Sequence, residues 1–295
     1  YFVADDGCLY CVRASDGQLV WRFRGAPLPQ KVIGNGRLIS AWPTRGGPVE
    51  RDGVIYFATS IWPFMGTFIY AIDAETGDVR WINDSTSADF IKQPHGAPAF
   101  AGVAPQGQLA ATAECLLAPG GRSLPACFDR KTGRQKYFDF GGKGQGGSFV
   151  AASESRYFVH TRRRATMAFT LADGRDDKWH LNEPVLAADY VYAANTPGDD
   201  DGQSAPGVIQ AFDAGKQLVW QVEADGSGDL IRAGRRLYAA GRGVLTAIEL
   251  PSGDAPARVA WTQPIKGPVR RLLAGDGMLF AVTEDGRILA FGGEK

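Results

Sequence analysis

Histidines and common catalytic motifs are scarce in this chain, which limits the chemistry that it could perform. The three histidines, His95, His160 and His180, are scattered along the sequence. There is no GxSxG nucleophile elbow and no CxxCH haem-attachment motif. Any one histidine could act as a general base, but none has a partner at a characteristic spacing. The sequence therefore predicts no catalytic residue and no metal ligand, although it leaves catalysis open.

One acidic loop could bind a hard cation. Asp199, Asp200 and Asp201 are adjacent, and calcium takes oxygen ligands. The loop lacks the alternating acids and the distal glutamate of an EF-hand, so the alternative is a solvated turn.

Four cysteines raise the question of redox or metal chemistry. Cys8 and Cys11 form a CxxC on a predicted strand, where side chains three positions apart point to opposite faces, so burial is favoured over ligation. Cys115 and Cys127 flank the turn-rich stretch APGGRSLPA and could face each other across a hairpin. Whether that second pair is bridged stays open.

Aromatic and cationic residues gather in two long stretches that interrupt the regular pattern described below. Such residues on irregular segments favour a binding surface. The alternative is that the rings brace the segments that carry them. The residues that we predict to bind are Trp42, Arg45, Trp62, Phe64, Lys92 and His95.

Composition excludes some classes of partner. The 295 residues contain 32 Lys plus Arg and 32 Asp plus Glu, without the basic excess that a nucleic-acid backbone attracts. No run approaches the roughly 20 apolar residues of a membrane span. The N-terminus has no signal-peptide pattern and starts within a strand-like run, YFVADDGCLYCV, so we expect the chain to be part of a longer protein.

An internal repeat is the strongest signal in the sequence. The string AIDAETGDVRW at residues 71–81 returns in degraded copies, and the later copies lie about 41 residues apart. A half-copy, LAFGG, ends the chain at residues 289–293. An aromatic residue closes each of six copies: Trp21, Trp81, Tyr137, Trp179, Trp220 and Trp261.

Each repeat predicts a four-stranded antiparallel sheet. Short alternating runs are separated by glycine-rich turns, and no window has a helical apolar stripe. Sheets repeated at about 40 residues are typical of a β-propeller. We therefore predict one all-β propeller domain over residues 1–295, with seven blades counted, or eight in an intact protein. The strand runs lie near residues 1–25, 38–84, 108–140, 148–181, 184–223, 229–263 and 268–293, the first without its inner strand and the last without its outer strand.

The residues of the repeat suggest a packing device. The acid, as in Asp73, can accept bonds from the following turn, and the glycine, as in Gly77, suits a left-handed position. The closing ring, as in Trp81, is large enough to fill the wedge between blades, and the small residue, as in Ala71, leaves room for a neighbouring ring. We predict that the six closing aromatics dock one blade on the next.

The pattern A-x-D-x-x-x-G-x-x-x-W, intact as Ala71, Asp73, Gly77 and Trp81, resembles the tryptophan-docking repeat of the PQQ-like β-propeller superfamily. The resemblance covers nearly the whole chain. That superfamily includes quinoprotein dehydrogenases and the propeller lipoprotein of the outer-membrane β-barrel assembly machinery. The stretches GNGRLISAWPTRGGPV and FIKQPHGAPAFAGVAPQGQ also resemble secreted propellers of planctomycete-type bacteria.

The resemblance implies a place outside the cytoplasm, in the periplasm, the cell envelope or secreted. We expect a non-catalytic scaffold that contacts proteins or glycans through loops on one face, without a cofactor. The alternative is a reduced quinoprotein dehydrogenase that holds PQQ and calcium in the axial channel. The adjacent Cys-Cys pair usual in such enzymes is absent from the sequence.

Overall fold

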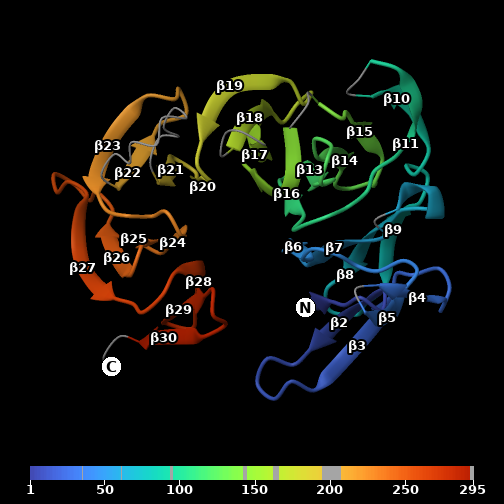
Figure 1. Cartoon of the computed structure of the whole chain (residues 1–295), viewed down its shortest axis with the longest axis horizontal. Helices are drawn as coiled ribbons and strands as arrows, with labels where there is room; N and C mark the ends of the chain where they lie inside the picture. The colour runs from blue at the N-terminus through green and yellow to red at the C-terminus, as the bar shows by residue number, and fades with distance from the viewer. Residues whose placement is uncertain are drawn as a thin grey trace. The chain divides into compact units, whose positions relative to one another are not determined.

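Short strands joined by turns and loops make up nearly all of the described part of the chain (Figure 1). The structure is a computed structural model that describes residues 1–295 except 35, 61, 94–95, 142–144, 162–165, 195–206 and 293–295. Its one helical element in those ranges is the 3-10 turn η1, Pro63–Met65. No helix in the described part of the chain has the length and apolarity needed to cross a membrane.

The described residues fall into two compact units. The first unit contains residues 1–163 and 167–178, and the second contains residues 164–166 and 179–295. Strand β19, Asp176–Leu181, crosses the boundary.

The first unit begins with a three-stranded sheet and continues with four-stranded ones. The first sheet has the order β1-β2-β3, and the next has β6-β7-β8-β9. Hairpin β4-β5 follows the first of these sheets, and hairpin β10-β11 follows the second. The four-stranded sheet β12-β13-β14-β15 comes next. The bounds are β1 Phe2–Val3, β2 Cys8–Val12, β3 Leu19–Arg24, β4 Lys31–Gly34, β5 Arg37–Ser40, β6 Val49–Arg51, β7 Val54–Thr59, β8 Phe68–Asp73, β9 Val79–Asn83, β10 Asp89–Lys92, β11 Pro98–Ala101, β12 Ala110–Ala111, β13 Cys115–Ala118, β14 Ala126–Asp129 and β15 Gln135–Tyr137.

The sheet that spans the boundary has the order β16-β17-β18-β19. Beyond it, the second unit holds two four-stranded sheets, β20-β21-β22-β23 and β24-β25-β26-β27, and a three-stranded sheet, β28-β29-β30. The bounds are β16 Gln145–Ala152, β17 Arg156–Thr161, β18 Thr166–Thr170, β20 Val185–Leu186, β21 Val191–Ala194, β22 Val208–Phe212, β23 Leu218–Glu223, β24 Asp229–Ala233, β25 Arg236–Ala240, β26 Val244–Glu249, β27 Arg258–Pro264, β28 Val269–Gly275, β29 Met278–Thr283 and β30 Ile288–Gly292.

This architecture confirms the predicted all-β propeller fold of four-stranded antiparallel blades. Among the described residues, the first sheet lacks the inner strand that would pair with β1, and the last sheet lacks the outer strand that would pair with β30, as the repeat predicts. One predicted boundary is wrong. Residues 38–40 were expected to open the second blade, but they form β5 of a separate hairpin, and that blade begins at Val49.

The repeat folds into a hairpin with a fixed register. In the copy at residues 71–81, the Asp73 carboxylate accepts backbone N–H bonds from Glu75 at 3.0 Å and Thr76 at 2.9 Å. Gly77 then takes a positive φ of 80°, which glycine adopts without strain. In five sheets the small residue pairs with the closing ring, and a β-bulge follows the pair: Cys11 with Trp21, Ala71 with Trp81, Cys127 with Tyr137, Ala211 with Trp220 and Ala247 with Trp261.

The closing rings of the first unit lie against turn glycines of the next sheet. A Cβ built on Gly77 would lie 3.0 Å from the Trp21 ring, and one built on Gly174 would lie 2.9 Å from Tyr137. The Trp81 ring covers Gly133 even more closely. Buried apolar clusters fill the same interfaces between successive sheets, for example Ile69 and Leu116 in one layer and Leu117 and Tyr157 in the next.

Candidate binding site on two hairpins

Hairpin β4-β5 has one buried face and one exposed face, because its strands alternate. Val32 pairs with Ile39, which is 3% exposed, whereas Ile33 pairs with Leu38 on the opposite face. Ile33 is 82% exposed and Leu38 is 67% exposed. The hairpin therefore presents a pair of aliphatic side chains to solvent.

Hairpin β10-β11 repeats this arrangement with aromatic rings. Phe90 pairs with Phe100, and their ring centroids lie 5.1 Å apart. Both rings are largely exposed, at 62% and 76%. Lys92 is exposed two positions from Phe90, so it shares the face of the two rings. Asp89 points the other way, where Gln135 Nε2 donates to its carboxylate at 3.5 Å.

Trp42 does not lie on the exposed faces of the two hairpins, and its burial favours the bracing alternative over the predicted binding role. The side chain is 8% exposed and clusters with Ala26 and Ala41. Its indole N–H donates to the Met65 carbonyl at 2.7 Å. The ring braces the segment after β5 against the segment around η1, which is the alternative that the sequence left open.

The other predicted binding residues differ in how far they are exposed to solvent. Phe64 on η1 is 83% exposed, whereas Trp62 is half-buried before it. Arg45 is also half-buried, between β5 and β6. His95 lies outside the described residues, as do Asp199, Asp200 and Asp201. Phe64 and Lys92 thus remain on the surface, each as a predicted binding residue.

Sequence reasoning missed the four residues that pair on the hairpins: Ile33, Leu38, Phe90 and Phe100. The signal was present, because KVIG with RLIS and DFIK with PAFA each alternate around a short turn. Both pairs lie outside the repeat of about 41 residues, so the repeat pattern predicts no function for them.

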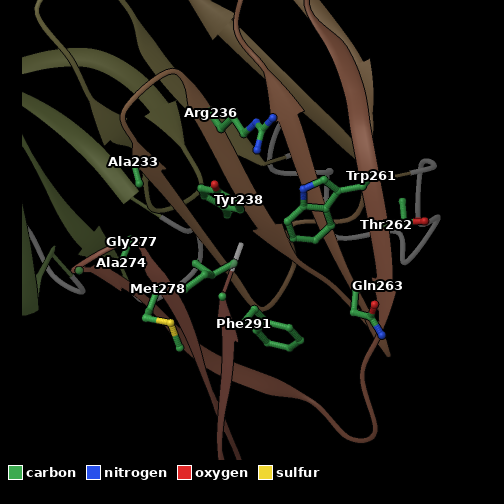
Figure 2. A pocket seen from close by; sticks show the side chains of 13 residues that line it. Ala233, Arg236, Tyr238, Trp261, Thr262, Gln263, Ala274, Gly277, Met278 and Phe291 are labelled. Atoms are coloured by element: carbon green, nitrogen blue, oxygen red, sulfur yellow. The ribbon is translucent and has the colours of Figure 1, made fainter. Parts of the chain in front are cut away.

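A cavity of about 650 Å³ lies in the second unit, between the sheet that ends in β27 and the sheet that ends in β30. Figure 2 shows side chains of both sheets around it. Trp261 comes from β27 and Phe291 from β30, with Tyr238, Met278 and Leu279 completing an apolar wall. Arg236 and Gln263 add polar groups. The cavity therefore suits an apolar group with a few polar atoms.

Buried ionisable groups serve structural contacts at the positions that the structure describes. The Asp229 carboxylate on β24 accepts a backbone N–H bond from Leu272 of β28 at 2.7 Å, and its burial raises its pKa. The four cysteines are free and buried. In the register of β13 and β14, Leu117 rather than Cys115 lies directly opposite Cys127. Within the described ranges, no three His, Cys, Asp or Glu side chains gather as metal ligands would.

Solved structures with a similar fold cover nearly all of this chain. BamB of Moraxella catarrhalis is 15% identical, with a TM-score of 0.46, over 97% of this chain and 91% of that one. The computationally designed protein Ika8 is 11% identical, with a TM-score of 0.58, over 98% and 79%. A europium-containing methanol dehydrogenase is 11% identical, with a TM-score of 0.53, over 98% and 70%. The similarity to these last two shows the fold alone.

No curated protein matches the sequence. The family of the outer membrane protein assembly factor BamB matches residues 1–198 and 205–295, which is nearly the whole chain. The repeat register, the docked rings and this match agree, and the chain therefore belongs to the BamB family of β-propellers.

Proposed function

We propose that this protein is a non-catalytic binding module that acts outside the cytoplasm, in the cell envelope or secreted. Its partners are proteins of an envelope or extracellular assembly, and the contacts are made through hairpins β4-β5 and β10-β11. The family, described as an outer membrane protein assembly factor, supports an assembly role.

The observation that carries this proposal is the pair of exposed apolar contacts. Ile33 with Leu38 and Phe90 with Phe100 lie on hairpins that add no strand to any blade. Burial of a large apolar side chain stabilises a complex by about 1.5–3 kcal/mol, so each pair can anchor a partner. Aliphatic chains do not stack on sugars as rings do, and the aliphatic pair therefore favours a protein over a glycan.

The scaffold also suits this role because its sheets are held rigidly. A two-stranded hairpin alone is marginally stable in water. Here the buried face of β4-β5 packs through Val32 on Trp42 and Ala41, and Asp89 of β10 contacts Gln135 of β15. These contacts hold the exposed pairs in place before binding, which lowers the entropy lost on association.

Photo-crosslinking in the source organism tests the proposal. A crosslinking amino acid replaces Phe90 in one variant, Ile33 in a second, and exposed Lys131 in a control. We expect discrete adducts with the same partner from positions 90 and 33 and none from position 131. The variant with Phe90→Ser and Phe100→Ser should lose the adduct at position 33 if both hairpins hold one partner. Adducts no different from those of the control position would contradict the proposal.

The absence of a cofactor is part of the proposal and has its own test. Native mass spectrometry with metal analysis, on protein purified from its source, should show the mass of the polypeptide without PQQ or calcium. Bound PQQ with one calcium would instead favour a quinoprotein dehydrogenase.

A further inference from the structure

The sheet β12-β13-β14-β15 departs from the repeat by carrying two thiols on one face. Cys127 takes the place of the small residue of the repeat, opposite Tyr137. Leu117 of β13 lies directly opposite Cys127, and Cys115, two positions before Leu117, points to the same face. Cys115 and Cys127 are therefore diagonal neighbours on paired strands, and both belong to the buried cluster that faces the next sheet.

The two thiols are close enough to influence each other. Burial, and then the charge on Cys115, raise the pKa of Cys127. Diagonal neighbours in an antiparallel pair are about 7–8 Å apart, and a disulfide usually joins Cα atoms no more than about 6.8 Å apart. A shift of about 1 Å between the strands would therefore allow the bond. Cys115 is the first residue of β13, where fewer ladder hydrogen bonds resist such a shift.

A lysine on the outer strand donates to one of the two thiols. Lys136 Nζ lies 3.4 Å from Cys115 Sγ. This bond raises the pKa of Lys136, so the side chain stays an ammonium. A cation beside a thiol favours the thiolate, which is the form that reacts with oxidants. Cys115 therefore has the surroundings of a reactive cysteine, whereas Cys127 is enclosed by apolar side chains.

The counterpart of this lysine in the preceding sheet has a different partner. Arg80 of β9 holds the corresponding position, directly before the closing ring, and pairs with Asp73, the acid of its repeat. Lys136 directly precedes Tyr137, but its hydrogen bond goes to a thiol. The same position of the repeat thus carries a cation that serves the turn in one sheet and contacts a cysteine in the next.

A buried hydroxyl of the neighbouring sheet lies at the other end of the pair. Tyr157 of β17 is 0% exposed, and in the described part of the chain its hydroxyl has no hydrogen-bond partner. Burial, and then the nearby Cys127, raise the pKa of Tyr157, so the hydroxyl stays protonated. A buried donor without an acceptor is unusual. A negative sulfur at Cys127 would supply that acceptor.

We propose that Cys115 and Cys127 are a site of reversible oxidation, at which hydrogen peroxide converts the two thiols into a disulfide between β13 and β14. The Cys115 thiolate attacks one peroxide oxygen, so that an S–O bond forms and the O–O bond breaks. The departing hydroxide leaves as water with the proton that the Cys115 thiol has lost. This step gives a sulfenic acid at Cys115.

The second step uses the neighbouring thiol. The Cys127 sulfur attacks the sulfenic sulfur of Cys115, so that the S–S bond forms and the S–O bond breaks. The hydroxide leaves as water with the Cys127 proton. Two thiols thus lose two electrons, and one peroxide is reduced to two waters. This inference goes beyond the proposed binding function and does not depend on it.

Burial decides which oxidant can reach the site. Cys115 is 3% exposed, whereas Lys136, whose ammonium lies against the sulfur, is exposed. Movement of this one long side chain opens a path for hydrogen peroxide, which has only two heavy atoms. A glutathione disulfide or a protein disulfide is too large for the same path. Lys136 does not trap the sulfenic acid itself, because an ammonium has no lone pair to attack sulfur.

Peptide mapping of the reduced whole chain, after treatment with a small excess of hydrogen peroxide, tests the site. Free thiols are blocked with N-ethylmaleimide in urea before digestion and mass spectrometry. We expect a cross-linked peptide pair that joins Cys115 to Cys127. Cys8 and Cys11 should be recovered as blocked thiols, because they are also buried but point to opposite faces of β2. Dithiothreitol should return the cross-linked pair to thiols.

Lysine variants test whether the ammonium activates the site. Lys136→Gln should slow the oxidation several-fold, and Lys136→Arg should keep the rate of the unchanged protein. Lys131→Gln is the matched control, because Lys131 lies in the turn of the same hairpin and pairs with Glu114 at 3.1 Å. That control should oxidise at the unchanged rate.

Cysteine variants assign the two roles. Cys127→Ala gives this sheet the small residue that most other copies have, and Cys115→Val copies Val54 at the corresponding position of β7. Both variants are therefore expected to fold, which circular dichroism with thermal melting checks. Cys127→Ala should accumulate a sulfenic acid at Cys115 that dimedone traps. Cys115→Val should leave Cys127 reduced.

Four results would overturn the inference. The first is that Cys115 and Cys127 stay reduced in peroxide, and the second is a disulfide that joins two chains on a non-reducing gel. The third is an equal oxidation rate for Lys136→Gln and the unchanged protein. The fourth is a cross-link that forms only in urea, because it would belong to the unfolded chain. None of these measurements involves a partner, so failure here is distinguishable from failure of the proposed function.

Discussion

The indole of Trp81 lies directly on the turn glycine Gly133 of the following sheet. A Cβ at Gly133 would overlap the six-membered part of that ring, and the indole N–H donates to the Arg130 carbonyl at 3.0 Å. A ring from one sheet thus fixes the hairpin of the next by shape and by a hydrogen bond. The contact therefore joins the closing Trp81 of one repeat to Gly133 and Arg130 in the turn of the next repeat.

Gly133→Ala should destabilise the protein much more than Gly17→Ala. Both glycines have a φ of 72° at the same position of the repeat, but nothing lies within 4 Å of a Cβ at Gly17. The backbone strain of alanine, about 1–2 kcal/mol, is then common to both variants. Overlap with Trp81 should add about 1–3 kcal/mol in the first. Urea unfolding measures both, and equal midpoints would contradict the docking role of Trp81.

Asp73→Asn should lower stability at neutral pH and have a much smaller effect near pH 2. Hydrogen bonds from the Thr76 backbone N–H, and then the Arg80 guanidinium, lower the pKa of Asp73 to about 2. A lowered pKa in the folded state means that the ionised form stabilises the fold. That contribution is present above about pH 4 and is lost as the pH falls through about 2.

Thermal melting of both proteins between pH 7 and pH 2 checks this prediction. Asp254→Asn is the matched control, because Asp254 is exposed in the longer turn of a later repeat. A stability difference for Asp73→Asn that persists undiminished at pH 2 would assign the effect to shape rather than to charge.

Trp42→Phe should destabilise the fold, whereas Phe64→Ala should leave stability nearly unchanged. The first variant removes the indole donor of the Met65 carbonyl in a partly buried contact, which costs about 0.5–1.5 kcal/mol. The second removes a ring that is 83% exposed. Differential scanning calorimetry compares them. If Trp42→Phe weakened partner binding at full stability, Trp42 would be a binding residue after all.

The Cys127 thiol should resist alkylation in the folded protein. Burial, and then the neighbouring Cys115, raises the pKa of Cys127 to about 12, so little thiolate exists at pH 8. Mass spectrometry after iodoacetamide treatment should find Cys127 unmodified in buffer and alkylated in urea. Rapid labelling in buffer would show that the sheet of β13 and β14 opens.

The fold was predictable because its determinants are local and repeated. The motif around Ala71, Gly77 and Trp81 recurs, and each copy specifies the same turn, register and ring contact. The predicted start of the second blade at residues 38–40 was wrong because strand pairing cannot be seen in the residues of one strand alone. The stretch RLIS reads as a blade strand, and only its pairing with KVIG shows that it belongs to a hairpin.

The binding residues were harder to predict, since exposure depends on long-range packing. Trp42 and Phe64 look equivalent in the sequence, as large rings on irregular segments. Only the fold shows that one ring is enclosed by Ala26 and Ala41 and the other faces water. The exposed pair of Phe90 and Phe100 requires the cross-strand register, which single-residue patterns do not give.

The docking contacts also have a direction along the polypeptide. Trp21 lies on Gly77, Trp81 on Gly133 and Tyr137 on Gly174. Each ring is therefore covered by a glycine that comes later in the chain. On a ribosome, a sheet that has emerged would therefore keep its ring exposed until the next hairpin is synthesised. Chain growth and fold completion are thereby coupled one repeat at a time, and a pause in translation would leave the closing ring and the apolar face of the last sheet uncovered.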